Sequence, residues 1–485
     1  MRKALFICLL LSVFSLTGCN DRLDGDGVGG STLNGQLVQI LSAHYTNPDS
    51  LFIGSSSSPE SNPDLVQFMK STLMPLFGNP AKEQIEKLDK MFEEKVGLTP
   101  DGHRQWRLES YEFTYRTKSA RGEDIVLSGV VAFPNNTVEG VDHAVKFLDL
   151  SSHAAATASS RALMGEGYYQ RALFNSAFIM PDFQGYGNTL GKETYCFMSS
   201  EVLARQLADC ALAALDVMHL CGVSLAPYGY TFNQGTSQGA VIPVAFAKWY
   251  ETKAPQSFKD QIRLRATLAS NGPCDFASLM WYLSSHPEFD ATLSNRIVVS
   301  LLALSPEQLG GYSALDFLSD ASRNTIVTVD GVPMPYYEAV GKYEYNVWGA
   351  EKDAPSIRSM SDILAPDMLT SQGKLNSESP KTQAFFRILS EQNPVYDWSP
   401  SLPIYFVHCP QDNAIPYEVA HDYYDVLSGR GSNGNVHFGN LRLPPLSGAV
   451  LGRVPFATHL VASLIIGMRE LESDSVENLT DDWEN

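Results

Sequence analysis

The chain has 485 residues, of which 44% are hydrophobic and 18% are charged. This composition is typical of a globular protein with a large core and excludes a disordered chain. The formal net charge of −19 argues against nucleic-acid binding, because so acidic a surface repels phosphate backbones.

The first nineteen residues have the pattern of a secretory signal. A basic region at Arg2 and Lys3 precedes an apolar run, 4–14, that is too short to span a bilayer as a mature helix. Leu16-Thr17-Gly18-Cys19 resembles a bacterial lipobox, which would make Cys19 the lipidated first residue; the alternative is an ordinary signal peptide in which this cysteine is incidental. The polar, Gly-rich stretch 20–30 predicts a tether. We therefore expect a lipid-anchored protein of the bacterial cell envelope, outside the cytoplasm.

Residues 31–108 predict a helical N-terminal extension. Asn62-Pro63 has the pattern of a helix start, and Ile85, Leu88, Phe92 and Val96 form the apolar face of a second helix. From residue 110 the pattern changes to strands, and the alternation of Tyr111, Phe113 and Tyr115 with polar residues predicts a half-exposed edge strand.

Strands and helices alternate in the rest of the chain. The further strands expected are 125–133, 144–150, 177–180, 228–233, 265–269, 404–408 and 436–443, and the clearest helices are 203–218, 240–249 and 417–427. This order predicts an α/β fold with a mostly parallel sheet and helices on both faces.

A long interval separates the strands 265–269 and 404–408. Within it, residues 276–395 hold a helix start at Ser305-Pro306 and many aromatic side chains. We interpret this stretch as one insertion that caps the carboxyl edge of the sheet; the alternative is a separate domain with its own core. The expected organisation is a signal (1–19), a tether (20–30), the helical extension (31–108), a core in two parts (109–275 and 396–470), the cap (276–395) and an acidic tail (471–485).

Seven cysteines are present. Cys8 is lost with the signal and Cys19 is acylated in the lipoprotein interpretation. The remaining five are Cys196, Cys210, Cys221, Cys274 and Cys409. Their number is odd and they lack metal-ligand spacing. One or two disulfides and buried thiols are both compatible with this count.

The pentapeptide Gly235-Thr236-Ser237-Gln238-Gly239 fits Gly-x-Ser-x-Gly, the nucleophile elbow of serine hydrolases. The residues before it predict a strand and those after it a buried helix, which is the setting that the elbow needs. The helix N-terminus then offers its dipole and its N–H groups to an oxyanion. A serine hydroxyl also needs an imidazole base and an acid that orients the base.

Asp412, in the loop that follows strand 404–408, is the candidate acid; as a purely structural residue it would form a turn or cap the next helix. Asp397, Asp422 and Asp425 are weaker rivals. The histidines after Asp412 are His421, His437 and His459. His459 is the candidate base, because it ends a Gly/Pro-rich loop before an apolar run and such a loop can reach over the sheet edge.

With these residues the chain resembles the α/β-hydrolases, in which the acid and then the histidine follow the serine. His408-Cys409-Pro410-Gln411-Asp412 resembles the acid loop of that family, with Cys409 in place of the usual glycine, and Pro181-Asp182-Phe183-Gln184-Gly185-Tyr186-Gly187 resembles a family segment in which the aspartate is structural. The resemblance covers roughly residues 110–275 and 396–470 and implies an α/β-hydrolase fold. It also implies an oxyanion hole made by the backbone N–H of Gln238 and a second donor among Ser151, Ser152 and His153, of which we choose Ser152.

We therefore expect a serine hydrolase of the esterase or lipase type. Ser237, His459 and Asp412 would cleave a carboxylic ester, small or borne on a polymer, through an acyl-enzyme, without metal or cofactor. A peptidase on the same fold, of the aminopeptidase or prolyl oligopeptidase kind, is the nearest alternative. A non-catalytic binding lipoprotein is the alternative from another class. The oligomeric state stays open.

Overall fold

A nine-stranded sheet forms the centre of the computed structural model, with the strand order β1-β2-β3-β5-β4-β6-β7-β10-β11. The structure describes residues 35–46, 80–96, 105–138, 140–152, 175–197, 199–286, 293–309, 311–348, 357–394, 396–412, 414–429 and 434–440. The strands are β1 (Leu37–Thr46), β2 (Trp106–Lys118), β3 (Asp124–Asn136), β4 (His143–Ser152), β5 (Ser176–Pro181), β6 (Val223–Thr236), β7 (Leu264–Ser270), β10 (Ile404–His408) and β11 (Val436–Asn440). Strands β5, β4, β6, β7, β10 and β11 run parallel, and β1, β2 and β3 extend the sheet by antiparallel pairing. This is the predicted mostly parallel sheet.

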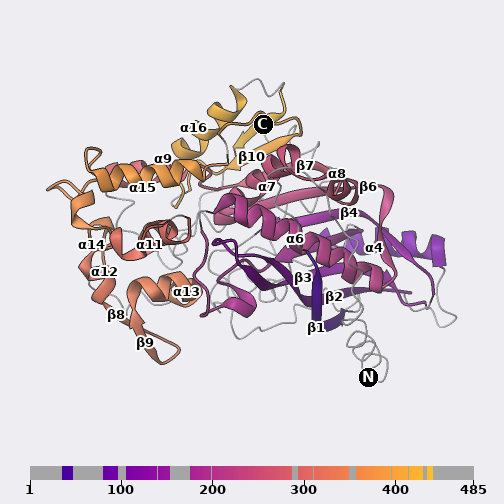
Figure 1. Cartoon of the computed structure of the whole chain (residues 1–485). Coiled ribbons are helices and arrows are strands. Elements are labelled where there is room, and N and C mark those ends of the chain that lie inside the picture. The colour runs from indigo at the N-terminus through magenta and orange to yellow at the C-terminus, as the bar shows by residue number, and fades with distance from the viewer. Residues whose placement is uncertain are drawn as a thin grey trace.

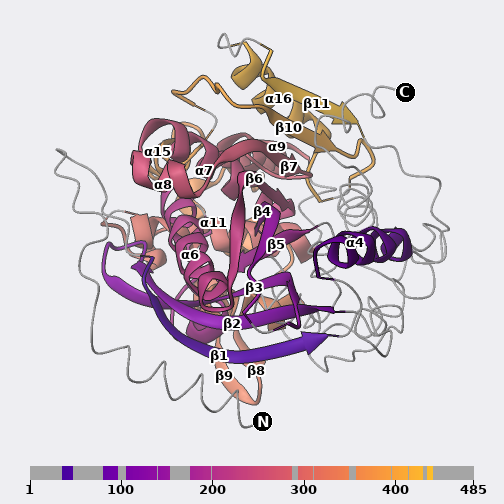
Figure 2. The ribbon, with the colours of Figure 1, turned by 90° about the vertical axis from the view of Figure 1, so that its right-hand side faces the viewer.

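Helices cover both faces of the sheet (Figure 2). They are α4 (Pro80–Val96), α6 (Ser200–Leu220), α7 (Val241–Thr252), α8 (Gln256–Gln261) and α16 (Tyr417–Ser428). On one face α6 packs its small and apolar side chains against the sheet, beside α7. On the other face Leu88 and Phe92 of α4 bury a smaller cluster with Trp106, whose indole N–H donates to Asp89 Oδ1 at 2.6 Å. Of the apolar stripe predicted for α4, Leu88 and Phe92 therefore pack against the sheet.

Residues 276–394 add a second group of elements at one side of the sheet (Figure 1). They are α9 (Phe276–Ser285), α11 (Leu293–Leu309), η6 (Ala314–Asp316), α12 (Asp320–Asn324), the hairpin β8 (Ile326–Val329) with β9 (Val332–Pro335), α13 (Tyr336–Trp348), α14 (Met360–Ile363), η7 (Pro366–Met368) and α15 (Pro380–Glu391). Their buried side chains, such as Leu302, Phe317 and Phe385, belong to the same apolar cluster as α6 and α7.

The loop after β5 is tied to this second group. The N–H of Gly191 donates to Lys342 O at 3.1 Å and the N–H of Tyr195 to Gly341 O at 2.9 Å. A side chain at Gly191 would collide with the Tyr343 ring, and Tyr343 itself breaks the helical backbone of α13. The elements of 276–394 thus contact the carboxyl edge of the sheet at β5; the division of the chain into domains stays a prediction.

Three local expectations were wrong. Leu37–Thr46, inside the expected helical extension 31–108, is strand β1, because it pairs along β2 and packs the partly buried Leu37 and Ile40 against the core. Strand β2 is consequently not at the sheet edge. Pro306 does not begin a helix: it lies in the last turn of α11, where Ser305 Oγ bonds back to Leu301 O at 2.9 Å within the same helix. The helix start expected at Asn62-Pro63 lies outside the described residues.

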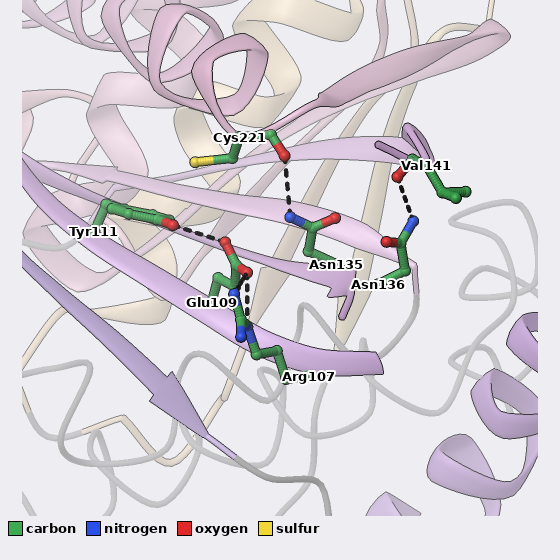
Figure 3. A network of polar contacts seen from close by, with 7 residues as sticks. All are labelled: Arg107, Glu109, Tyr111, Asn135, Asn136, Val141 and Cys221. Carbon is green, nitrogen blue, oxygen red and sulfur yellow. Dashed lines mark hydrogen bonds and ion pairs between the residues drawn. The ribbon is translucent and has the colours of Figure 1, made fainter. Parts of the chain in front are cut away.

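Polar side chains close the opposite, amino edge of the parallel strands (Figure 3). The carboxylate of Glu109, only 2% exposed, accepts a hydrogen bond from Tyr111 Oη at 2.7 Å and forms an ion pair with Arg107 at 2.7 Å. Asn135 donates to Cys221 O at 3.1 Å, which ties β3 to the turn between α6 and β6. This network fastens the edge that lies away from the elbow.

The structure describes the five cysteines that are expected to remain in the mature protein. All five cysteines predicted to remain in the mature protein are thiols, and four of them are buried. Burial raises the pKa of Cys196 and of Cys274 to about 12. Within the described ranges, no helix is both long enough and apolar enough to cross a bilayer.

Candidate active site

Ser237 lies at the turn between β6 and α7, where the elbow motif predicted it. Its backbone is left-handed, with φ of +59°, and η5 (Ser237–Ala240) leads from it directly into α7. A Cβ at Gly235 would lie 2.1 Å from Gly239 O and 2.7 Å from Ser152 O. The first glycine of the motif is therefore required because backbone passes on both sides of it.

The two predicted oxyanion residues lie beside this turn. Gln238 directly follows Ser237 in η5 and is 5% exposed. Ser152 ends β4 and pairs with Gly235 of β6, and its Oγ is buried without a hydrogen-bond partner among the described residues. Both residues border the elbow, but which N–H groups would bind an oxyanion stays a prediction. His153, the third alternative for the second donor, lies outside the described residues.

Asp412 lies in a tight loop after β10. Its own N–H donates to Cys409 O at 2.9 Å, and its Oδ1 accepts from the N–H groups of Ala414 at 2.8 Å and Ile415 at 2.9 Å. The side chain is 7% exposed. The imidazole of His408 bonds Ile415 O at 3.0 Å and so closes the far end of the same loop. This loop, Cys409–Ile415, is called the acid loop below.

Strand order brings the elbow and the acid loop to one edge of the sheet. β6 and β10 are both neighbours of β7 and run parallel to it. Ser237 and Asp412 each come after the carboxyl end of their strand, so both lie on the same side of the sheet. Since adjacent strands are about 4.8 Å apart, the two strand ends are separated by about 10 Å.

The rival acids and bases lie elsewhere. Asp397 precedes β10, and Asp425 on α16 pairs with His421 Nδ1 at 3.1 Å. His437 pairs with Tyr405 near the amino end of β10 and stacks on its ring at 4.7 Å. Burial lowers the pKa of His437. His459, the predicted base, lies outside the described residues, as does Cys19.

Asp182 has a structural role, as the resemblance implies. Its Oδ2 accepts from Ser128 Oγ at 2.5 Å, and its N–H donates to Ser128 O at 2.8 Å. The same hydroxyl accepts from the N–H of Asn188 at 3.0 Å, which fixes the turn that follows β5. In the described ranges no cluster of three His, Cys, Asp or Glu side chains is arranged to hold a metal ion.

Two buried polar residues near this edge were missed by the sequence analysis. Asp149 of β4 accepts from Gln234 Nε2 of β6, close to the pair that Ser152 forms with Gly235. Asn271 follows β7 with a left-handed φ of +48° and is fully buried. The Asn-Gly pair at 271–272, directly after a buried strand, is a turn signal that could have indicated the second of these.

The comparisons with known proteins concern the fold. No protein-family model matches the chain, and no curated protein matches it by sequence. The rice cell wall degrading esterase LipA from Xanthomonas oryzae, in a ligand-bound form, superposes with a TM-score of 0.59 at 16% identity, over 90% of this chain and 98% of that one. A putative hydrolase from Legionella pneumophila gives 0.51 at 18% identity, over 81% and 96%. Candida antarctica lipase A gives 0.51 at 13% identity, over 87% and 80%. The chain therefore has the α/β-hydrolase fold, in the form that these esterase and lipase structures share.

Proposed function

We propose that the protein is a serine hydrolase that cleaves carboxylic esters through an acyl-enzyme. Ser237 attacks the carbonyl carbon, His459 takes the serine proton and returns it to the leaving alcohol, and Asp412 orients the imidazole. Water then releases the acid by the same route. The similar structures of an esterase and a lipase support this class of substrate.

One observation carries the proposal. Five described residues other than glycine have a left-handed backbone, and four of them are asparagine or aspartate, which tolerate that conformation. Ser237 is the exception. A strained serine between a strand end and a helix start is the arrangement that exposes a nucleophilic hydroxyl at the sheet edge.

The support for Asp412 is the chemistry of its loop. Two backbone N–H groups donate to one carboxylate oxygen and so fix the orientation of the side chain within its loop. The separation of about 10 Å between the ends of β6 and β10 leaves room for an imidazole between the two side chains.

Labelling with a fluorophosphonate probe tests the nucleophile. The wild type is expected to react and Ser237→Ala is expected not to. Ser305→Ala is the matched control, because Ser305 is buried within α11 and its hydroxyl donates to a carbonyl of the same helix. Equal labelling of Ser237→Ala and wild type would disprove the assignment of the nucleophile. A wild type that does not label would favour a binding protein on a hydrolase scaffold.

Asp412→Asn and His459→Gln test the other two roles. In Asp412→Asn the side-chain amide oxygen can still accept the two loop N–H groups, so the fold is expected to survive while kcat falls by about 10²–10⁴-fold. Folding is checked by thermal unfolding of each variant. Wild-type kcat in either variant would remove that residue from the mechanism.

A substrate panel separates ester from peptide hydrolysis. We expect acetyl, butyryl and long-chain nitrophenyl esters to be cleaved faster than aminoacyl nitroanilides. A preference for the anilides would favour the peptidase alternative. Acetylated polysaccharide belongs in the panel, because one similar structure is described as a cell wall degrading esterase.

We also propose that Cys19 carries a lipid that anchors the protein outside the cytoplasm. The basic, apolar and Leu-Thr-Gly-Cys segments support this, with a polar tether after them. Expression in a bacterium fed radiolabelled palmitate should label wild type but not Cys19→Ser. Label in both proteins would refute the anchor at this residue.

A further inference from the structure

The turn that leaves β7 lies between the elbow and the acid loop. β7 pairs with β6 on one side and with β10 on the other, so that Ser270 lies opposite both Thr236 and Val407. The next two residues, Asn271 and Gly272, are therefore placed beside both loops. This three-residue segment, Ser270–Gly272, is called the bridging turn.

Asn271 makes the contacts to the acid loop. Its backbone N–H donates to Val407 O at 2.8 Å, which continues the pairing of β7 with β10. Its side-chain Oδ1 accepts from the N–H of Cys409 at 2.8 Å. Cys409 is the first residue of the acid loop, and its carbonyl in turn accepts the N–H of Asp412 at 2.9 Å. One hydrogen bond to the Asn271 side chain thus holds Cys409, whose carbonyl closes the turn at Asp412.

Gly272 makes the contacts to the elbow. A Cβ at this position would lie 2.2 Å from Ala240 Cβ and 3.0 Å from Ser237 O, so the backbone passes directly over the first turn after the nucleophile. Tyr423 of α16 donates its hydroxyl to Gly272 O at 3.0 Å and fastens the turn from the other side. The bridging turn is therefore held against the elbow and the acid loop at once.

The residue type at 271 matters because of its backbone conformation. Glycine adopts a left-handed φ most cheaply, and asparagine is the next best tolerated. What asparagine adds is a side-chain oxygen, and at this site that oxygen is bonded to Cys409. Asn271 is fully buried and its Nδ2 has no hydrogen-bond partner among the described residues. The buried amide is therefore bonded through its oxygen to the acid loop, which indicates that asparagine is needed here for that hydrogen bond.

We propose that Asn271 is a positioning residue of the catalytic centre. Through its hydrogen bond to Cys409 it fixes the position of Asp412 relative to Ser237. The inference rests on the proposed function, since it assigns Asn271 to the same triad. Asn271 does not touch the reacting atoms. It acts through the acid loop, so its loss should weaken the chemical step and leave substrate binding nearly unchanged.

Asn271→Gly tests this role. Glycine keeps the left-handed backbone and removes the hydrogen bond to Cys409. We expect kcat to fall by about 10–100-fold with KM within about 2-fold, because a misplacement of a catalytic group by about 1 Å costs roughly this much. The rate of fluorophosphonate labelling should fall in parallel, since it depends on the same activated serine.

Asn175→Gly is the matched control. Asn175 is also buried and left-handed, with φ of +59°, and its side chain bonds His143 Nε2 at 3.0 Å before the amino end of β5. It should lose a similar amount of thermal stability without loss of kcat. If both variants lose kcat in proportion to their loss of stability, Asn271 is merely structural and the proposal is wrong.

Asn271→Asp provides a rescue and a second test if the glycine variant does not fold. Aspartate tolerates the backbone and keeps an acceptor for the Cys409 N–H. On the alkaline plateau of the pH profile, where a change in the pKa of the base no longer enters, kcat should stay within about 5-fold of wild type. A larger loss would show that the acceptor is not what the site needs. Labelling of wild type alongside separates the two proposals: no wild-type reaction removes both, whereas equal reaction of wild type and Asn271→Gly removes only the positioning role.

Discussion

Replacing Gly235 by alanine should disable the elbow more than it destabilises the protein. The added Cβ would lie 2.1 Å from Gly239 O and 2.7 Å from Ser152 O, where an ordinary contact needs at least 3.4 Å. Both neighbours are backbone atoms, so neither can move by a side-chain rotation. The relief has to come from a shift of the Ser237 turn or of the end of β4.

The expected stability loss follows from the size of this overlap. Overpacking by one methyl group in a close-packed core costs about 1–3 kcal/mol. In a chain of this size that loss corresponds to a Tm shift of a few degrees. An overlap of about 1 Å is of the order that displaces catalytic groups, so the labelling rate and kcat should fall by about 10²-fold or more.

Gly229→Ala separates the local effect from the general one. Gly229 lies earlier in the same strand, and its Cβ would meet Lys146 O at 2.6 Å and Leu225 Cδ1 at 2.6 Å. It is also crowded by a backbone oxygen, but it lies in the middle of β6, away from the elbow. Thermal unfolding and fluorophosphonate labelling of both variants form the assay. We expect similar losses of Tm and a loss of labelling in Gly235→Ala alone.

Two results would refute this reasoning. If Gly235→Ala labels at the wild-type rate, the close approach at the elbow does not control the serine. If Gly229→Ala loses labelling to the same degree, the loss reflects global destabilisation rather than the geometry of the turn.

Three further predictions concern groups away from the elbow. Burial raises the pKa of Cys196 and Cys274 from 9.0 to about 12, so their thiolate fraction at pH 8 falls by about 10³-fold. In the native protein these thiols should therefore resist a disulfide reagent that reacts with them in denaturant. Rapid reaction in the native protein would contradict this. Burial is also the main cause of the raised pKa of Asp89, so folding disfavours the charged form of this carboxyl. Asp89→Asn should therefore raise Tm at pH 7, and the gain in Tm should grow as the pH rises above 3.8 through the folded-state pKa. A gain in Tm that does not depend on pH would be inconsistent with this explanation. Glu109→Ala removes the carboxylate that accepts from the buried Tyr111 hydroxyl and should cost about 1–3 kcal/mol in denaturant unfolding while the labelling rate is kept. A parallel loss of labelling would link the amino edge to the site.

The parts of the fold that could be predicted from the sequence are those set by local pattern. Continuous apolar runs marked β5 and β10, and spaced apolar residues marked α4 and α6. Strand β1 was missed because its conformation depends on a partner far along the chain: Leu37 pairs with Tyr115, and its own sequence alternates poorly. Pairing energy of this kind cannot be read from a short window.

The elements of 276–394 show the same limit more strongly. Aromatic residues suggested a cap. The hairpin β8–β9 did have a local signal that was not used, the Asp330-Gly331 pair directly after a β-branched run, whereas nothing local indicated the break in α13 at Tyr343. That break fits against Gly191, which lies far earlier in the chain and where a side chain would not fit. Such contacts depend on tertiary packing, and one sequence does not specify them by pattern.

The candidate site divides along the same line. The places of Ser237 after β6 and of Asp412 after β10 could be predicted because each residue belongs to a short motif, whereas their catalytic roles stay predictions. The turn at Asn271 could have been recognised from its Asn-Gly pair, but its place beside both loops could not. That place depends on register: Ser270 lies between Thr236 and Val407, and only this alignment sets the next residue beside both loops.

The neighbouring strands β6 and β7 are each followed by a residue with a left-handed backbone that is not glycine. Thr236 and Ser270 are paired across β6 and β7, and the residue after each, Ser237 and Asn271, is left-handed although it carries a side chain. Glycine adopts this backbone more easily than serine or asparagine does, so the side chain at each position must contribute something that glycine would not. For Asn271 that contribution is the hydrogen bond to Cys409. For Ser237 we infer that the contribution is the reactivity of its hydroxyl. In the proposed catalytic centre the two positions act together: Ser237 would supply the nucleophile and Asn271 would fix the loop that carries Asp412.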